Sequence, residues 1–264
     1  MSILNVLFIG DVVAQAGLKA IARHLPRLRR DVPIHLTIAN GENAAAGFGL
    51  TRAIADELFG LGVDVITGGN HLWDKREILE FIADEPRIVR PANDHGGELG
   101  ARSGVFAATT GQRVAVLSLM GRVFMPPAED PFRCADEMIP ALRRETPIVI
   151  VDIHAEATSE KSALGWYLDG QVSAVLGTHT HVQTADERIL PAGTAYLTDV
   201  GMTGPYTSVI GTEREPAIQR FLTATSQRLS PASGDPRLAA AVIAIDGETG
   251  RARSIRRILW GESD

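Results

Sequence analysis

Short apolar runs of strand length alternate along this sequence with segments whose apolar residues recur at helical spacing. In the N-terminal part the strand-like runs are residues 5–9, 34–39 and 64–67, and helix-like segments at 18–30 and 51–61 separate them. Such alternation predicts βαβ units with parallel strands. We therefore expect an α/β fold, with Thr51 capping the second helix.

The pattern changes after a further helix expected at residues 75–84. Runs at 104–109 and 113–119 flank a short polar turn, and runs at 238–245 and 253–259 flank a turn containing two glycines. Both pairs predict antiparallel hairpins. A helix is expected at 134–144 and strands at 148–153 and 172–176, so the chain should combine parallel and antiparallel strands. No repeat or long linker divides it, and we expect one domain over residues 1–264.

Charge and cysteine content exclude several classes of protein. The 264 residues include 26 Lys and Arg against 32 Asp and Glu, a net charge of -6, which disfavours a protein that binds long nucleic acid. The single cysteine, Cys134, cannot form an internal disulfide, so a reducing compartment is expected, with the cytoplasm as the default. No apolar run approaches the ~18 residues that a membrane span needs, and the N-terminus lacks the basic region of a signal peptide.

Polar residues follow five of the predicted strands at their carboxyl ends, where ligands bind in α/β folds. These candidate metal ligands are Asp11, Glu42, Asn43, Asn70, His154, His179 and His181. Each has an alternative structural role. Asp11 could form a turn or cap a helix, Glu42 and Asn43 could belong to a polar loop, and His154 could be a hydrogen-bonded core histidine.

His179 and His181 carry more information than the other candidates. In an extended segment their spacing of two residues projects both imidazoles to the same side, which a metal explains best and a surface pair explains less well. Imidazole mixed with carboxylate and amide oxygens suits a divalent or trivalent metal, and the absence of cysteine excludes a thiolate zinc site. Seven converging ligands are too many for one catalytic ion and suit two, with Glu42 the natural bridging carboxylate.

A nucleotide-binding loop is the other motif that the first strand end could contain. Ile9-Gly10-Asp11 lacks G-x-G-x-x-G and places an acid where a phosphate would approach. We therefore assign no dinucleotide-binding residues.

These motifs resemble a known family. Gly10-Asp11, Gly41-Glu42-Asn43, Gly69-Asn70-His71, the single His154 and Gly177-Thr178-His179-Thr180-His181 are similar to the calcineurin-like metallophosphoesterases, in the YmdB-like branch. Stretches 40–45, 68–74 and 198–205 extend the similarity over nearly the whole chain. The sequence departs from the wider superfamily in two places: Val13 replaces the histidine of Asp-x-His, and Gly41-Glu42-Asn43 replaces Gly-Asp-x-x-Asp.

The resemblance implies a fold and a set of roles. The fold would be two facing mixed β-sheets flanked by helices, an α/β/β/α sandwich. One metal would be held by Asp11, Glu42, Asn43 and His181, and the other by Glu42, Asn70, His154 and His179. Asn43 would supply an oxygen ligand in compensation for the missing histidine, and iron or manganese suits this oxygen-rich site better than zinc. The resemblance makes His71 the catalytic acid that protonates the leaving oxygen; its alternative role is to order the loop.

The expected function is that of a binuclear metal-dependent phosphodiesterase in which hydroxide attacks phosphorus. The lack of a strongly basic composition favours a small phosphodiester as substrate, and the family resemblance implies cyclic nucleotides, with 2′,3′-cyclic forms a better expectation than 3′,5′-cyclic ones. Two alternatives remain at this point: a metal-binding regulatory or scaffold protein with little turnover, and a paired-metal amidohydrolase, whose His-x-His would lie on an early barrel strand. A homo-oligomer is expected on general grounds.

Overall fold

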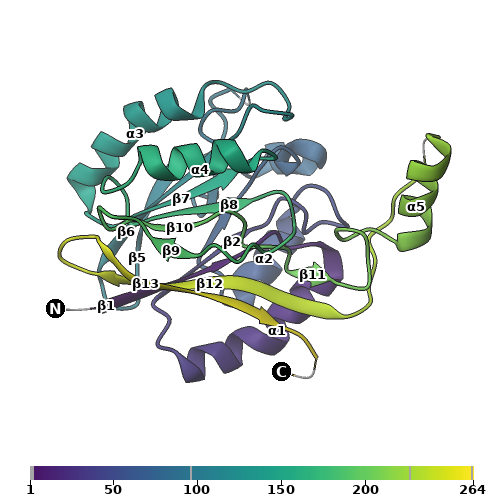
Figure 1. Cartoon of the computed structure of the whole chain (residues 1–264), viewed down its shortest axis with the longest axis horizontal. Helices are drawn as coiled ribbons and strands as arrows, with labels where there is room; N and C mark the ends of the chain where they lie inside the picture. The colour runs from purple at the N-terminus through teal and green to yellow at the C-terminus, as the bar shows by residue number, and fades with distance from the viewer. Residues whose placement is uncertain (1–2, 96, 226, 263) are drawn as a thin grey trace.

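Two facing β-sheets with helices on their outer sides make up the molecule (Figure 1). The computed structural model describes residues 3–95, 97–225, 227–262 and 264. The expected α/β/β/α arrangement of mixed sheets is confirmed. The expectation of a single domain stays a prediction.

The first sheet contains both ends of the described chain. Its strands are β1 (Ile3–Ile9), β2 (Leu36–Asn40), β3 (Val65–Thr67), β4 (Ile88–Val89), β11 (Gly204–Pro205), β12 (Pro236–Asp246) and β13 (Ala252–Trp260). Strands β1 to β4 are parallel neighbours in chain order, as the βαβ pattern predicts. β12 pairs antiparallel with β1 and forms the expected hairpin with β13.

The second sheet is parallel in its centre and antiparallel at its edges. Its strands are β5 (Ser103–Ala107), β6 (Arg113–Met120), β7 (Val149–His154), β8 (Ala174–Thr178), β9 (Arg188–Ile189) and β10 (Ala195–Leu197), in the order β5-β6-β7-β8-β10-β9. The predicted hairpin is formed by β5 and β6, and β6, β7, β8 and β10 run parallel.

Four of the five α-helices in the described part of the chain cover the outer faces of the two sheets. They are α1 (Ala14–Asp31), α2 (Arg52–Gly60), α3 (Pro131–Glu145), α4 (Thr158–Tyr167) and α5 (Arg214–Thr223), with 3₁₀ turns η1 (Leu72–Asp74) and η2 (Arg76–Glu80). Helices α1 and α2 pack on the first sheet, and α3 and α4 on the second. α5 projects away from the sheets (Figure 1). No helix among the described residues is both long and apolar enough to cross a bilayer.

Burial on both faces explains why the strands read as continuous apolar runs. In β1, Val6 and Phe8 point into the core between the sheets, whereas Leu7 and Ile9 pack against the helices. The same alternation holds in β6 and β7. The sheets are therefore fixed face to face, with their carboxyl edges side by side.

The structure corrects one expected helix and confirms one expected cap. The helix predicted at residues 75–84 was wrong: Lys75 is extended, residues 76–80 form the short 3₁₀ helix η2, and residues 81–84 are turns. The Lys75 backbone lies so close to Gly49 that a Cβ on Gly49 would be 2.9 Å from the Lys75 nitrogen, and a residue packed in this extended conformation cannot begin a helix. At α2 the Ile54 N–H donates to Thr51 Oγ1 at 3.4 Å, as predicted.

Gly177 in β8 should tolerate no side chain. A Cβ there would lie 1.8 Å from the Thr198 carbonyl oxygen, whereas a Cβ on Gly60, the last residue of α2, would meet nothing within 4 Å. We expect Gly177→Ala to lower the free energy of unfolding by about 3 kcal/mol, because backbone must move. The control Gly60→Ala should leave it unchanged or raise it by up to about 1 kcal/mol. Urea unfolding followed by circular dichroism measures both; equal stabilities would contradict the close approach.

Candidate metal centre

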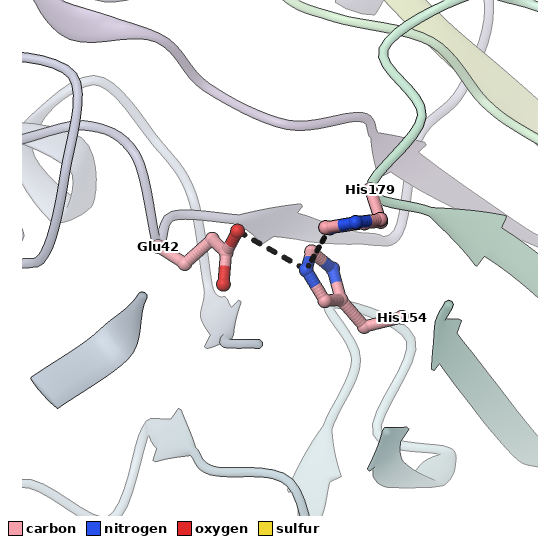
Figure 2. A group of neighbouring side chains, drawn as sticks. All are labelled: Glu42, His154 and His179. Atoms are coloured by element: carbon pink, nitrogen blue, oxygen red, sulfur yellow. Dashed lines mark hydrogen bonds and ion pairs between the residues drawn. The ribbon is translucent and has the colours of Figure 1, made fainter. Parts of the chain in front are cut away.

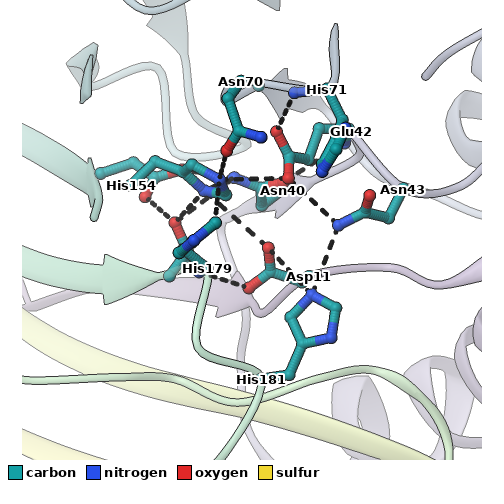
Figure 3. Close-up of polar contacts among 12 residues, drawn as sticks. Asp11, Asn40, Glu42, Asn43, Asn70, His71, His154, His179 and His181 are labelled. Atoms are coloured by element: carbon teal, nitrogen blue, oxygen red, sulfur yellow. Dashed lines mark hydrogen bonds and ion pairs between the residues drawn. The ribbon is translucent and has the colours of Figure 1, made fainter. Parts of the chain in front are cut away.

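Seven side chains from the carboxyl edges of both sheets meet in one place (Figure 3). The first sheet supplies the residues that follow β1, β2 and β3, and the second sheet supplies the residues at the ends of β7 and β8. The full set is Asp11, Glu42, Asn43, Asn70, His154, His179 and His181. The structure therefore brings together all the predicted ligand residues, at the seam between the sheets.

The inner part of this site is formed by Glu42, His154 and His179, whose potential ligand atoms all lie within 4.8 Å of one another (Figure 2). His154 Nε2 lies 3.1 Å from Glu42 Oε1 and 3.1 Å from His179 Nδ1. Asn70 Oδ1 is also 3.1 Å from His154 Nε2. Two imidazoles, a carboxylate and an amide oxygen thus converge on a single point, a donor set that suits a divalent transition metal.

The outer part of the site contains Asp11, Asn43 and His181. His181 Nε2 lies 3.8 Å from Asp11 Oδ1, and the Asn43 amide contacts His181 Nε2 and Glu42 Oε1 at 3.3 and 3.1 Å. A 180° rotation of the Asn43 side-chain amide would place its oxygen where its nitrogen now lies. Asp11 Oδ1 is buried and has no hydrogen-bond partner among the described residues. An unsatisfied buried carboxylate oxygen is costly, and a cation at this point would satisfy it.

Hydrogen bonds orient all three histidines toward the centre of the site. In each ring one nitrogen is occupied by a partner outside the cluster, and the other nitrogen faces the cluster. The occupied contacts are His154 Nδ1 to Thr178 Oγ1 at 2.9 Å, His181 Nδ1 to the Ile210 carbonyl at 2.9 Å and His179 Nε2 to Glu156 Oε2 at 3.1 Å. This is the arrangement that fixes metal-binding histidines in their ligating orientation.

Asp152 determines which nitrogen of His154 is free. The Thr178 hydroxyl donates its proton to Asp152 Oδ1 at 2.7 Å, so its oxygen must accept from His154 Nδ1–H. Thr67 and Asn40 also donate to Asp152, at 2.6 and 3.1 Å. Nε2 of His154 is thereby left to face the cluster.

The electrostatics of the inner group favour positive charge. Burial alone would raise the pKa of Glu42, but the charge and hydrogen bond of His154 outweigh burial and lower this pKa to about 2. Burial opposes the charged form of His154 as well, yet Glu42 raises the pKa of that imidazole to about 9. Burial and the neighbouring His154 lower the pKa of His179 to about 3. Glu42 therefore favours one positive charge beside it, at His154, and a metal ion would take the place of that proton.

The backbone that presents His179 and His181 differs from the expected extended segment. β8 ends at Thr178, and the two histidines have φ values of 93° and 62°, in the left-handed region. The expectation that an extended segment aligns them was wrong. Their imidazoles face the same site because two left-handed residues flank Thr180, a strained arrangement that the surroundings must hold.

Thr180 is held by a buried ion pair that the sequence did not reveal. Asp199 Oδ2 accepts from the Thr180 N–H at 3.1 Å and from its hydroxyl at 2.5 Å. Lys161 Nζ donates to the same carboxylate oxygen at 2.8 Å and to Thr180 Oγ1 at 3.1 Å, and both charged side chains are fully buried. Asp199 lies in one of the family-like stretches, but its spacing gave no signal of this contact.

His71 lies at the rim of the site, as predicted. The His71 backbone N–H donates to Glu42 Oε2 at 2.9 Å, and the ring Nδ1 pairs with Asp74 Oδ2 at 2.8 Å. Asp74 thus contacts Nδ1 of the ring and not Nε2. The His71 side chain lines a cavity of about 610 Å³ that also reaches Glu42, Asn43 and His179. The sequence analysis missed Asp74, although its position three residues after His71 on one short turn was the available signal.

Facing mixed sheets with an imidazole–carboxylate–amide cluster at their carboxyl edges define a metallophosphoesterase-like protein. The chain matches the family model described as YmdB-like protein over residues 7–258. The chain belongs to this YmdB-like family, as its motifs predicted.

Relatives of known name agree with this assignment. The chain is 52% identical to a Bacillus subtilis (strain 168) protein named 2′,3′-cyclic-nucleotide 2′-phosphodiesterase, over 97% of each chain. A solved structure of a novel phosphatase from Mycoplasma pneumoniae is similar with a TM-score of 0.93 and 34% identity, covering 99% of this chain and 94% of that one. The structure of a hypothetical protein from Thermus thermophilus has a TM-score of 0.91 and 45% identity, covering 98% of this chain and 100% of that one.

These similarities confirm the prediction of a phosphoesterase. The amidohydrolase alternative is wrong, because the described strands form two facing sheets and not a barrel.

Thr180→Val should test whether the buried ion pair holds the metal-facing histidines. Valine has the same shape but removes the hydroxyl between Asp199 and Lys161. We expect the free energy of unfolding to fall by about 1–3 kcal/mol and the metal affinity to fall with it. Thr110→Val, which loses one exposed hydrogen bond to Gln112, is the matched control. Urea unfolding and metal titration measure the two effects; unchanged metal affinity would contradict the positioning role.

Proposed function

We propose that the protein is a binuclear metal-dependent phosphodiesterase that opens 2′,3′-cyclic nucleotides. The observation that carries this proposal is the seven-donor cluster, with His71 at its rim lining the cavity and paired with Asp74. The name of the Bacillus subtilis relative supports the choice of substrate class and indicates cleavage of the bond between phosphorus and O2′.

Two metal ions would be held by two groups of donors that share Glu42. Asp11, Asn43 and His181 would complete one site, and Asn70, His154 and His179 the other. Iron or manganese suits this mixture of oxygen and nitrogen ligands. When bound, such ions supply positive charge that orients a phosphate and lowers the pKa of a water molecule to form the attacking hydroxide.

The protein's own residues complete the reaction by handling the leaving oxygen. Hydroxide adds to phosphorus, the P–O2′ bond breaks, and the electron pair goes to O2′. His71, as the imidazolium with a proton on each ring nitrogen, donates its Nε2 proton to O2′ and becomes neutral, so that a ribose hydroxyl and a 3′-phosphate result. Asp74 accepts from His71 Nδ1–H and thereby keeps Nε2 directed toward the substrate. Glu42 positions the same residue, because its second oxygen accepts from the His71 backbone N–H.

A regulatory metal-binding protein with little turnover would retain the same ligands. Metal analysis of the purified protein, combined with assays on phosphomonoesters, linear phosphodiesters and both kinds of cyclic nucleotide, separates the two functions. Bound metal without turnover would favour the regulatory alternative and overturn our proposal. Preference for 3′,5′-cyclic nucleotides would overturn the substrate assignment only. The cytoplasmic location and a homo-oligomeric assembly stay predictions.

Removal of the bridging carboxylate should affect both metals. In our assignment Glu42 would help to hold both ions, whereas Asp11 would help to hold only one. We expect Glu42→Ala to lose both metals together, because two unbridged cations repel each other more strongly in a partly dry site. Asp11→Ala should mainly weaken one site. Elemental analysis decides, and two metals per chain in Glu42→Ala would exclude the bridging role.

The His71→Ala variant should separate proton donation from metal binding. All seven proposed ligands remain, so metal content and fold should be unchanged. Turnover of a cyclic nucleotide should fall by roughly 10²–10⁴, the usual effect of losing a proton donor. The loss should be much smaller on a nitrophenyl phosphodiester, whose leaving group departs without a proton. Equal losses on both substrates would show instead that His71 binds phosphate or orders the loop.

A further inference from the structure

Phe48 is an aromatic side chain placed at the mouth of the catalytic cavity. Its ring centroid lies 5.0 Å from that of His71 at an interplanar angle of 61°, and 37% of the residue is exposed. It lines the same cavity as His71, Glu42 and Asn43, and it belongs to none of the hydrophobic core clusters of the described residues. The fold therefore presents this ring to the cavity and does not use it to fill the interior.

The loop that carries Phe48 holds the ring in a defined position. Both neighbours, Gly47 and Gly49, have positive φ values of 95° and 79°. A Cβ on Gly47 would lie 2.9 Å from the Pro231 side chain, and one on Gly49 would lie 2.7 Å from the Lys75 side chain. The turn is closed by a hydrogen bond from Ala45 N–H to the Gly49 carbonyl at 3.0 Å. A packed turn of this kind presents an aromatic ring at little cost in conformational entropy.

The chemistry of the substrate places its base near this ring. His71 must lie within hydrogen-bond distance of O2′ to protonate it. Only three covalent bonds, O2′–C2′, C2′–C1′ and C1′–N, separate that oxygen from the base. A base so close to His71 is also close to the aromatic ring that contacts His71, and aromatic rings bind bases by stacking.

We propose that Phe48 is the platform on which the nucleobase of the cyclic nucleotide stacks, an inference that rests on the function proposed above. The ring carries no hydrogen-bonding group, so stacking does not distinguish the bases by their edges. Phe48 thereby defines the substrate class as cyclic phosphates that carry an aromatic base, with larger purines bound more tightly than pyrimidines.

The test compares Phe48→Leu with wild type on substrates that have and lack a base. Suitable substrates are adenosine 2′,3′-cyclic phosphate and the 2′,3′-cyclic phosphate of methyl riboside, which keeps the ribose and the leaving oxygen. With the adenosine compound, kcat/KM should fall by about 10- to 100-fold, mainly through KM, the range for losing one base–aromatic stack. With the base-free compound it should stay within about 2-fold of wild type. Phe48→Trp, which keeps an aromatic ring at this position, should retain the wild-type activity on the adenosine compound.

Phe124→Leu is the matched control, because Phe124 is 89% exposed and does not line the cavity. It should behave as wild type on both substrates, and a selective loss there would overturn the inference. Equal losses in Phe48→Leu on both substrates would mean that Phe48 only packs against His71, which overturns the stacking role and leaves the proposed function intact. If the wild-type protein hydrolysed neither of the two cyclic phosphates, the proposed function and the inference would both be overturned.

Discussion

Four carboxyl groups are completely buried where the two sheets meet. The site is organised around the cations and hydrogen-bond donors that offset the cost of burying them. Asp11, Glu42, Asp152 and Asp199 all have no exposed surface. A buried carboxylate persists only when it is paired or hydrogen-bonded. Asp199 has the ammonium of Lys161, Asp152 accepts hydrogen bonds from hydroxyl and amide groups, and Glu42 has an imidazole and a backbone N–H. One oxygen of Asp11 is left over, and the geometry around it provides a place for a cation.

The segment 198–203 joins the two sheets at this point. Val200 N–H donates to the Gly177 carbonyl at the end of the second sheet, and Thr203 N–H donates to the Asp11 carbonyl at the end of the first. The approach is so close that a Cβ on Gly10 would lie 1.9 Å from the Gly201 oxygen. Glycine at both strand ends is therefore a steric requirement for bringing ligands from the two sheets together. The same segment contains Asp199, whose hydrogen bonds to Thr180 connect it to the loop that carries His179 and His181.

The parts of the fold that could be predicted are those with a strong local pattern. Strands buried on both faces leave apolar runs, as at β7, and polar residues directly after them indicated the candidate ligands. Helix α4 escaped prediction because Lys161, a charged residue, occupies one of its buried positions. Helix α5 has one buried residue, Ala217, and thus no apolar stripe. The contact of Asp199 with Thr180 and the left-handed backbone on either side of Thr180 arise from tertiary packing, which a single sequence does not record.

The pairing of β1 with β12 joins segments from opposite ends of the described chain. During synthesis β1 can pair with β2 early, but its other edge stays unpaired until residues 236–246, which form β12, have left the ribosome. Throughout that interval the strand that leads into Asp11 exposes unpaired backbone groups, which can pair with other unfinished chains. The first sheet therefore cannot be completed, and β1 cannot be paired on both edges, before the β12–β13 hairpin has been synthesised.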